Sequence, residues 1–273
     1  MEEKNYQELK QELNQLKKSQ TRSKYKFNFL ISIIAMLVLI SATLAWFTLS
    51  NFASLDTIDM TISTAPGLYI DISDKGTDVT AWQKVLTKEM VDQALTNAGN
   101  PALDDQLLDP VTSNNGIAFT NRTGDTRNAN DNSYIEFDVW FIATTDMWVH
   151  LSGDTVAING TEYTTQCTTT ETGAKADVVN ALRASFQDTA DPAPAWEPHK
   201  GAAVTGLTTF DVAPSTYTND TRIFHLDKLT PKKITFRVWA EGEDPECDDD
   251  IQSAKVSIQM LFGGTDDSNV LFS

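Results

Sequence analysis

The sequence predicts a mainly β protein: an antiparallel, jelly-roll-like β-sandwich with two short helical insertions, preceded by a single transmembrane or signal helix. Two patterns predict this fold. Eight to ten short segments after residue 50 alternate apolar and polar side chains, which is the period of a strand with one buried face. Before them lie 23 uncharged residues, 27–49, long enough to cross a bilayer as one helix. The chain therefore divides into an arm (1–26), an apolar segment (27–49) and an outer domain (50–273).

The arm is basic and has a helical pattern. Tyr6, Leu9, Leu13 and Leu16 recur at spacings of three and four, which predicts an amphipathic helix at the cytoplasmic face, with a short coiled coil as the alternative. Five basic residues crowd the N-terminal side of the apolar segment, namely Lys17, Lys18, Arg22, Lys24 and Lys26, and the first basic residue after it is Lys75. Because positive flanks stay in the cytoplasm, we expect residues 50–273 on the outer side of the cell membrane.

The apolar segment ends in the small residues of a signal-peptidase site. Thr43 and Ala45 fit its −3 and −1 positions, which predicts cleavage between Ala45 and Trp46. The length of the apolar run and of the arm favours an uncleaved anchor instead. Two locations follow: a domain held at the membrane through residues 27–49, or one secreted to the cell surface after cleavage.

The outer region is strongly acidic. The whole chain has a net charge of −17. Residues 1–26 hold seven Lys or Arg and four Glu, so the remainder has a net charge of −20. Such a surface repels nucleic acid and anionic membranes and favours divalent cations or basic partners. We therefore expect no nucleic-acid partner.

The first half of the outer domain is predicted to contain two strands, a helix and a loop. Residues 58–62 and 68–72 alternate as strands on either side of a Pro66-Gly67 turn. Residues 79–98 change to helical spacing and stop at Gly99-Asn100-Pro101. The polar run 112–133 is typical of a surface loop.

The second half is predicted to be a β-meander interrupted by one helix. Residues 135–141 form the clearest strand, residues 147–151 continue the pattern, and Asn159-Gly160 predicts a tight hairpin. Residues 176–186 have helical spacing, and 188–214 hold four of the nine prolines and no regular pattern. Strands at 234–240 and 256–262 close the domain.

Two cysteines, Cys167 and Cys247, fall in the outer domain. A disulfide persists in an extracellular compartment, so parity and location predict that the two are paired. The bridge would close a loop of about 80 residues and stabilise the fold by roughly 4 kcal/mol. Two unpaired, buried thiols are the alternative.

An acidic run, EGEDPECDDD, lies between the last two predicted strands. Ca²⁺ takes six to eight oxygen ligands, and the candidate ligands here are Glu243, Asp244, Asp248, Asp249 and Asp250. The run has no EF-hand spacing, so a solvated loop between strands is the stronger interpretation. Apart from this Ca²⁺, we expect no cofactor.

Catalytic signatures are absent from the sequence. His150, His199 and His225 have no zinc-ligand spacing, and neither a nucleophile elbow nor a phosphate-binding glycine loop is present. His150 is expected to face outward on its strand. Trp140, Trp148 and Trp239 fall on the faces opposite the aliphatic stripes, which indicates a glycan-binding or assembly surface unless a second layer covers them.

Three stretches resemble a known family: "ATLAWFTLSN", "TIDMTISTAPGLYIDIS" and "FRVWAEGEDPECDDDIQSAKVSIQMLF". They are similar to the TasA/camelysin-like surface proteins of Firmicutes, whose signal segment is handled by the peptidase SipW. The similarity touches the two ends of the outer region and leaves its middle uncovered. It implies a jelly-roll sandwich and a role in extracellular fibres of the biofilm matrix.

These observations predict a bacterial cell-surface structural or assembly protein, either a biofilm-matrix fibre subunit or a membrane-anchored surface domain. We expect self-association or contact with other surface proteins. An extracellular ligand- or glycan-binding module is the alternative, and a secreted hydrolase is the third and weakest, so no enzyme is expected.

Overall fold

The computed structural model describes residues 31–33, 36, 57–106, 108–190, 195–198, 208–211 and 213–272. The chain divides into two units, Met1–Asn51 and Phe52–Ser273. Among the described residues, no helix is both long and apolar enough to cross a membrane. The predicted arm (1–26), the cleavage site at Ala45 and Trp46, and all but four residues of the apolar segment lie outside the described residues.

The domain that follows the apolar segment is mainly β, as predicted, with few and short helices. Its strands are β1 (Thr57–Thr64), β2 (Leu68–Asp71), β3 (Val85–Leu86), β4 (Phe119–Thr120), β5 (Thr126–Arg127), β6 (Ile135–Ala143), β7 (Met147–Leu151), β8 (Val156–Ile158), β9 (Thr161–Tyr163), β10 (Gln166–Thr168), β11 (Leu182–Asp188), β12 (Phe224–Leu226), β13 (Lys232–Ala240) and β14 (Lys255–Thr265). Its α-helices are α2 (Lys88–Ala98) and α3 (Val178–Ala181). The short 3-10 helices are η1 (Val79–Ala81), η2 (Leu103–Asp105), η3 (Ala129–Asp131), η4 (Gly173–Asp177), η5 (Asn219–Thr221) and η6 (Asp249–Ile251).

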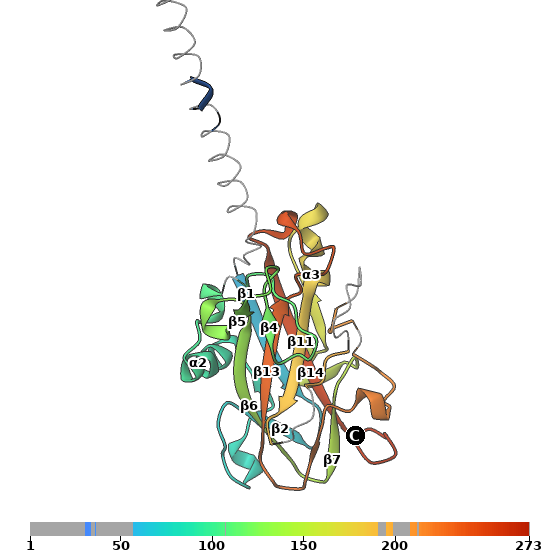
Figure 1. Cartoon of the computed structure of the whole chain (residues 1–273). Coiled ribbons are helices and arrows are strands. Elements are labelled where there is room, and N and C mark those ends of the chain that lie inside the picture. Colours follow the sequence, from blue (N-terminus) through green and yellow to red (C-terminus); the bar gives the residue numbers. More distant parts are fainter. Residues whose placement is uncertain are drawn as a thin grey trace, which may run out of the picture. The chain divides into compact units, whose positions relative to one another are not determined.

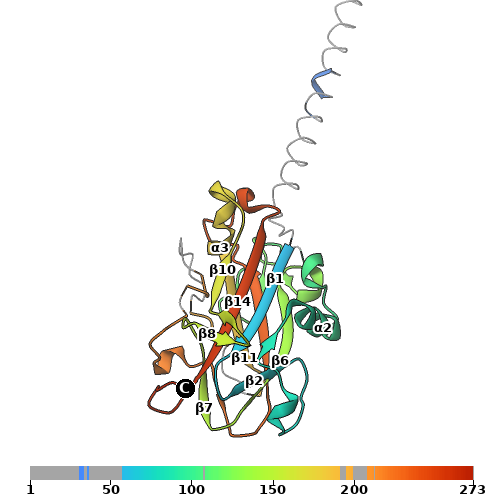
Figure 2. The ribbon, with the colours of Figure 1, turned by 180° about the vertical axis from the view of Figure 1, so that it is seen from behind.

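The larger sheet has six strands and is mixed. Its order is β12-β7-β14-β1-β3, and β10 also pairs with β14 (Figure 2). β1 runs parallel to β14 in a continuous register from Thr57 opposite Lys255 to Thr64 opposite Phe262. The prediction of a wholly antiparallel sandwich is therefore wrong at this pair. The first and last long strands of the domain lie side by side in the same direction.

The smaller sheet has four antiparallel strands in the order β11-β13-β6-β2, and faces the viewer in Figure 1. Along β6, the residues Ile135, Phe137, Val139 and Phe141 are all buried, which confirms the predicted inward face. The Pro66-Gly67 turn carries the chain from β1 in the larger sheet to β2 in this one, and Gly67 has the positive φ of 77° that favours glycine.

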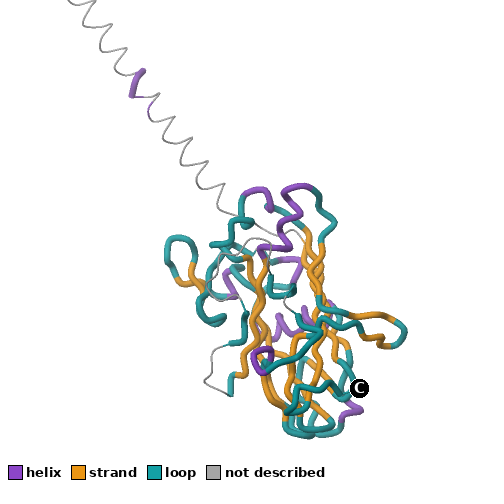
Figure 3. Tube along the Cα trace, turned by 90° about the vertical axis from the view of Figure 1, so that its right-hand side faces the viewer, coloured by secondary structure: helices purple, strands orange, loops and turns teal. Residues whose placement is uncertain are grey.

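One apolar core fills the space between the two sheets, whose strands form two layers in Figure 3. Phe262 of β14 reaches across it to the smaller sheet. Its ring centroid lies 5.4 Å from Phe141, 5.3 Å from Phe186 and 5.4 Å from Phe236. Each aromatic pair contributes roughly 0.5–1.5 kcal/mol beyond the area it buries. These contacts hold the two layers together.

A second apolar cluster covers the upper part of the outward face of the smaller sheet. It consists of Val111, Phe119, Ala129, Tyr134 and Trp239. Phe119 stacks on Tyr134 with a centroid distance of 4.1 Å and meets Trp239 edge-on at 5.0 Å. The predicted surface loop 112–133 thus contains β4, β5 and η3, and part of it packs onto the sheet.

Both predicted helices are present but shorter. Within 79–98, the regular helix α2 begins only at Lys88, after η1 and the short strand β3. It ends at Gly99, whose αL conformation lets its N–H donate to the carbonyls of Leu95 and Thr96. Within 176–186, α3 ends at Ala181, and the rest is strand β11. Because Leu182, Ala184 and Phe186 also alternate, pairing with β13 overrides the helical spacing.

Candidate functional site

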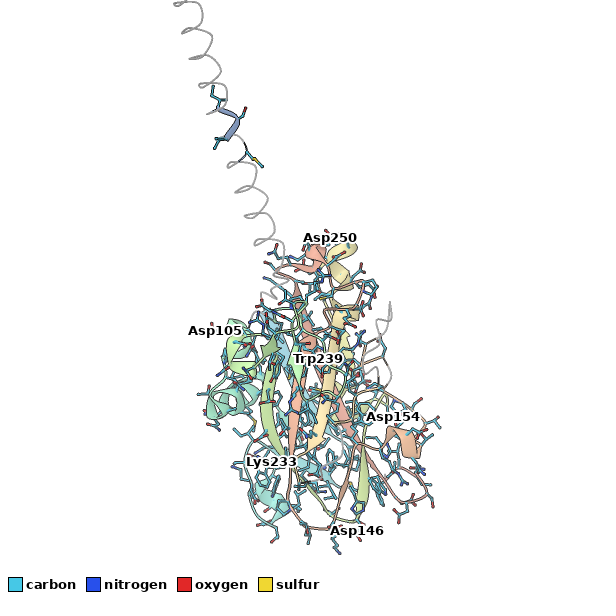
Figure 4. The ribbon with its side chains drawn as sticks, viewed as in Figure 1. Asp105, Asp146, Asp154, Lys233, Trp239 and Asp250 are labelled. Carbon is cyan, nitrogen blue, oxygen red and sulfur yellow. The ribbon has the colours of Figure 1, made fainter. Side chains whose placement is uncertain are left out.

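A cluster of hydrogen-bonded polar side chains, among them a buried histidine, lies at the end of β7. His150 lies on β7, and Ser152 and Asp154 follow it. Tyr217 and Thr221, more than 60 positions further along the chain, pack against them. The close approach depends on Gly153, because a Cβ there would lie 2.3 Å from the backbone oxygen of Ala213, and the Gly153 N–H donates to the carbonyl of Pro214 at 2.9 Å. Figure 4 labels Asp154 on this side of the molecule.

His150 is fully buried, although it points away from the core between the sheets. Its Nδ1 lies 2.9 Å from both the carbonyl oxygen and the hydroxyl of Thr221, and its Nε2 lies 2.9 Å from the hydroxyl of Thr265. The pKa of His150 is lowered to about 4, chiefly by burial and to a smaller extent by the nearby charge of Arg222, although the backbone contact with Thr221 raises it. The imidazole is therefore neutral at physiological pH. The expectation of an outward strand residue was right about the face but wrong about exposure.

Ser152, Asp154 and Tyr217 form a closed triangle of hydrogen bonds. The hydroxyls of Ser152 and Tyr217 are 2.6 Å apart, and Tyr217 donates to Oδ2 of Asp154 at 2.7 Å. Burial raises the pKa of Tyr217 above its usual range, and the acceptor Asp154 adds to this, whereas the contact with Ser152 lowers it. The phenol therefore stays protonated and acts as a donor.

This cluster does not have the geometry of a hydrolase relay. A Ser-His-acid triad needs one imidazole nitrogen on the nucleophile and the other on the carboxylate. Here both nitrogens of His150 contact threonines, and Ser152 contacts Tyr217 and Asp154. The hydrogen bonds instead join the 213–222 segment to the end of β7. His199 lies outside the described residues, and His225 contacts Trp148 and Asp227 elsewhere.

Trp148 is half-buried, and its ring and N–H both contact neighbouring side chains. The guanidinium of Arg222 lies 4.7 Å over its ring, the ring of His225 meets it edge-on at 4.9 Å, and its N–H donates to Asp267 at 3.0 Å. Trp239 is buried in the second apolar cluster and donates to Glu241 at 3.0 Å. The alternative that a second layer covers the tryptophans is thus correct for Trp239. For Trp148, the guanidinium of Arg222 covers one face of the ring.

The acidic run folds back on the domain. Asp244 is buried and forms an ion pair with Arg183 of β11, and Asp248 caps η6 through the N–H of Asp250. Figure 4 shows Asp250 at the end of the domain opposite to Asp146. Among the described residues, which include Glu243, Asp244, Asp248, Asp249 and Asp250, no group of three or more acidic, His or Cys side chains is placed to hold a metal ion. The structure does not bring the predicted Ca²⁺ ligands together.

The predicted disulfide is wrong. Cys167 and Cys247 are both free thiols. Cys167 lies on β10 opposite Ile258, and Cys247 lies in the turn that follows β13, where its N–H donates to the carbonyl of Asp244. Each packs with the core as an apolar side chain, and burial raises the pKa of each thiol to about 12. Parity and compartment say nothing about whether the fold brings two cysteines together.

Sequence reasoning missed two of the residues that build these sites. Tyr217 lies in the polar stretch STYTND, and Arg183 lies inside a predicted helix. The buried Arg183 could have been found from the alternation of 182–186, which places it on the outward face of a strand. Nothing local distinguishes Tyr217 from other loop residues.

Comparisons with models of protein families, with curated proteins and with solved structures find no match for this chain. The resemblance to TasA/camelysin-like surface proteins therefore stays a prediction.

Proposed function

We propose that this protein is a cell-surface structural or assembly protein with a jelly-roll-like sandwich domain outside the membrane. In this proposal residues 27–49 either anchor it or are removed by cleavage after Ala45, and its partners are copies of itself or other surface proteins. It has no catalytic role. The observation that carries the proposal is the position of β1.

β1 is the first strand after the apolar segment, yet it occupies the interior of the larger sheet. It lies between β14 and β3, and Ile58, Met60 and Ile62 are fully buried. β1 is held by the hydrogen bonds of the sheet and by three apolar side chains. The β1 strand of a neighbouring copy can make the same contacts and so take its place. Exchange of β1 between copies would link them in a chain, which is the assembly we propose.

The polar cluster at the end of β7 supports the same conclusion. Its side chains hydrogen-bond to one another, and they do not form the Ser-His-acid arrangement that a hydrolase needs. The strongly acidic outer region also favours solubility between assembly events, since copies with a net charge of the same sign repel each other until a specific contact forms.

Cross-linking of β1 to β14 tests the exchange directly. Thr61 and Gln259 are register partners, so we would replace both with cysteine in a Cys167→Ser, Cys247→Ala background. A short bifunctional thiol reagent is applied to protein recovered from cells. We expect bonds between different chains, seen as a ladder on a denaturing gel, and filaments by electron microscopy.

A matched pair within the smaller sheet serves as the control. Gln187 and Thr235 face each other on β11 and β13, and the corresponding double cysteine variant should cross-link only within one chain. Exclusively intramolecular cross-links for both pairs, in material without filaments, would contradict the proposal. N-terminal sequencing of the same material distinguishes an assembled form beginning at Trp46 from an anchored form that keeps Met1.

A further inference from the structure

The indole N–H of Trp140 is the feature of this fold that points to a ligand. Each of the other described tryptophans donates its N–H to a fixed acceptor: Trp82 to Gly76 O, Trp148 to Asp267, Trp196 to Asp220 O and Trp239 to Glu241. Trp140 has no acceptor among the described residues, and its half-buried side chain leaves the N–H open to solvent. An aromatic ring with an unused donor on a sheet face is suited to a partner that offers both apolar surface and hydroxyl oxygens.

The surroundings of Trp140 are polar and held in place. It lies on the outward side of β6, with Lys233 of β13 and Asp71 of β2 as its two cross-strand neighbours, and Asp138 is two positions away on the same face. Asp138 accepts from the hydroxyl of Thr235 at 2.7 Å and from the ammonium of Lys233 at 2.9 Å. The side chains of Lys233 and Asp138 remain 39% and 44% exposed. Figure 4 labels Lys233 low on β13, away from Trp239 and the apolar cluster that covers the upper part of this sheet.

We propose that the face formed by Trp140, Asp138 and Lys233 binds a neutral polysaccharide. A sugar ring stacks on the indole, its hydroxyls accept from the Trp140 N–H and the Lys233 ammonium, and another hydroxyl donates to the Asp138 carboxylate. Both charged groups are already oriented by their mutual contact and by Thr235, so little ordering is needed on binding. This activity is additional to the proposed assembly role, because it uses the other sheet and needs no exchange of strands.

Charge and hydrophobicity select this ligand class. Lys233 is balanced by Asp138, and Arg237 beside it is balanced by Glu136, so the face has no surplus positive charge to hold an anionic polymer. The net charge of −20 outside the arm repels such polymers as well. The large exposed apolar side chains described in this domain are Leu229, Val270 and Leu271, none of them on β6 or β13, so the face does not resemble a protein interface.

The test is retention of the purified full chain on insoluble polysaccharides. Cellulose and chitin are the neutral probes, alginate beads are the anionic probe, and soluble cello- and chito-hexaose are titrated by tryptophan fluorescence. We expect retention on at least one neutral probe, and at least a tenfold loss of affinity in Trp140→Ala and Asp138→Asn. Trp140→Phe keeps an aromatic ring without the N–H, so its affinity should lie between that of the parent and that of Trp140→Ala. The matched control, Trp148→Phe, should bind like the parent.

Three results would overturn the proposal. These are no retention of the parent on either neutral probe, equal binding by parent and Trp140→Ala, or tighter binding to alginate. Melting temperatures of all variants show whether a loss comes from unfolding, and Asp138→Asn, which changes an exposed side chain, keeps the test valid if Trp140→Ala does not fold. A Trp140→Ala protein that loses self-association without any glycan binding would assign the face to contact between copies instead. None of these outcomes depends on the cross-links between β1 and β14.

Discussion

Arg183 donates from its guanidinium to Oδ2 of Asp244 at 2.5 Å, and the two side chains are only 1% and 0% exposed. The same guanidinium donates to the carbonyls of Asn180 and Leu182. This ion pair ties the acidic run after β13 to the start of β11. It also explains why Asp244 is not available to a metal ion, because its charge is already matched by a buried cation.

We expect Asp244→Asn to destabilise the domain by about 3–5 kcal/mol, because it leaves the charge of Arg183 buried and unpaired. The free energy of unfolding in urea measures this. Asp104→Asn removes one partner of the exposed pair between Lys88 and Asp104 and should cost less than about 1 kcal/mol. The double change Arg183→Leu with Asp244→Leu should cost less than Asp244→Asn alone, since no unpaired charge remains. Equal costs for Asp244→Asn and Asp104→Asn would contradict the role of the buried pair.

The buried His150 makes stability depend on pH. Its pKa in the folded state is about 4, below the ordinary value of 6.5, so the folded state favours the neutral ring. The lowered pKa contributes a stability that is fully present above about pH 6.5 and is lost as the pH falls through 4. At 1.36 kcal/mol per pKa unit, the loss is at most about 3 kcal/mol. His150→Gln should flatten the curve of unfolding free energy against pH between 6.5 and 4 relative to the parent. Parallel curves for the two proteins would refute this.

The thiols of Cys167 and Cys247 should be unreactive in the folded protein. Burial raises the pKa of each to about 12, so almost no thiolate exists at pH 8. A thiol reagent such as DTNB should titrate no groups in native protein at pH 8 and two groups in guanidinium chloride. Intact mass should equal that of the reduced chain. A mass lower by two hydrogens would show that the two cysteines are paired and would contradict this prediction.

Gly153 should tolerate no side chain. A Cβ at this position would lie 2.3 Å from the backbone oxygen of Ala213, which cannot move aside as a flexible side chain does. We expect Gly153→Ala to cost about 1–3 kcal/mol through overpacking and to loosen the segment that carries Tyr217. Gly242→Ala is the control, because the nearest atoms lie at 3.4 Å, an ordinary contact distance. Similar unfolding free energies for the two variants would show that the 213–222 segment is not fastened at Gly153.

Local sequence patterns were sufficient where one face of an element meets the core. The alternation of Ile135, Phe137, Val139 and Phe141 predicted both the strand and its buried face, and Asn159-Gly160 predicted the turn between β8 and β9. The prediction of a helix was wrong at the start of β11, because there the pattern is ambiguous. Within the predicted helix 176–186, residues 182–186 fit a helical and a strand period at once, and only the partner strand β13 decides between them.

The candidate sites were predicted less well than the strands. Asp138 and Lys233 meet beside Trp140 because β6 and β13 pair in one particular register, although they are 95 positions apart. The contact of His150 with Thr221 and the burial of Trp239 likewise depend on segments that are distant in the chain. A residue type and its period specify a face, but they do not specify what packs against it.

The sequence by itself determined the β class of the domain after the apolar segment, most of its strands and the inward side of each, because alternation of apolar residues follows from burying one face. The tertiary structure alone decided that β1 runs parallel to β14, that Asp244 pairs with Arg183, and that Cys167 and Cys247 stay apart. Strand direction and long-range pairing leave no mark in a local pattern, since they depend on how the whole chain closes its core.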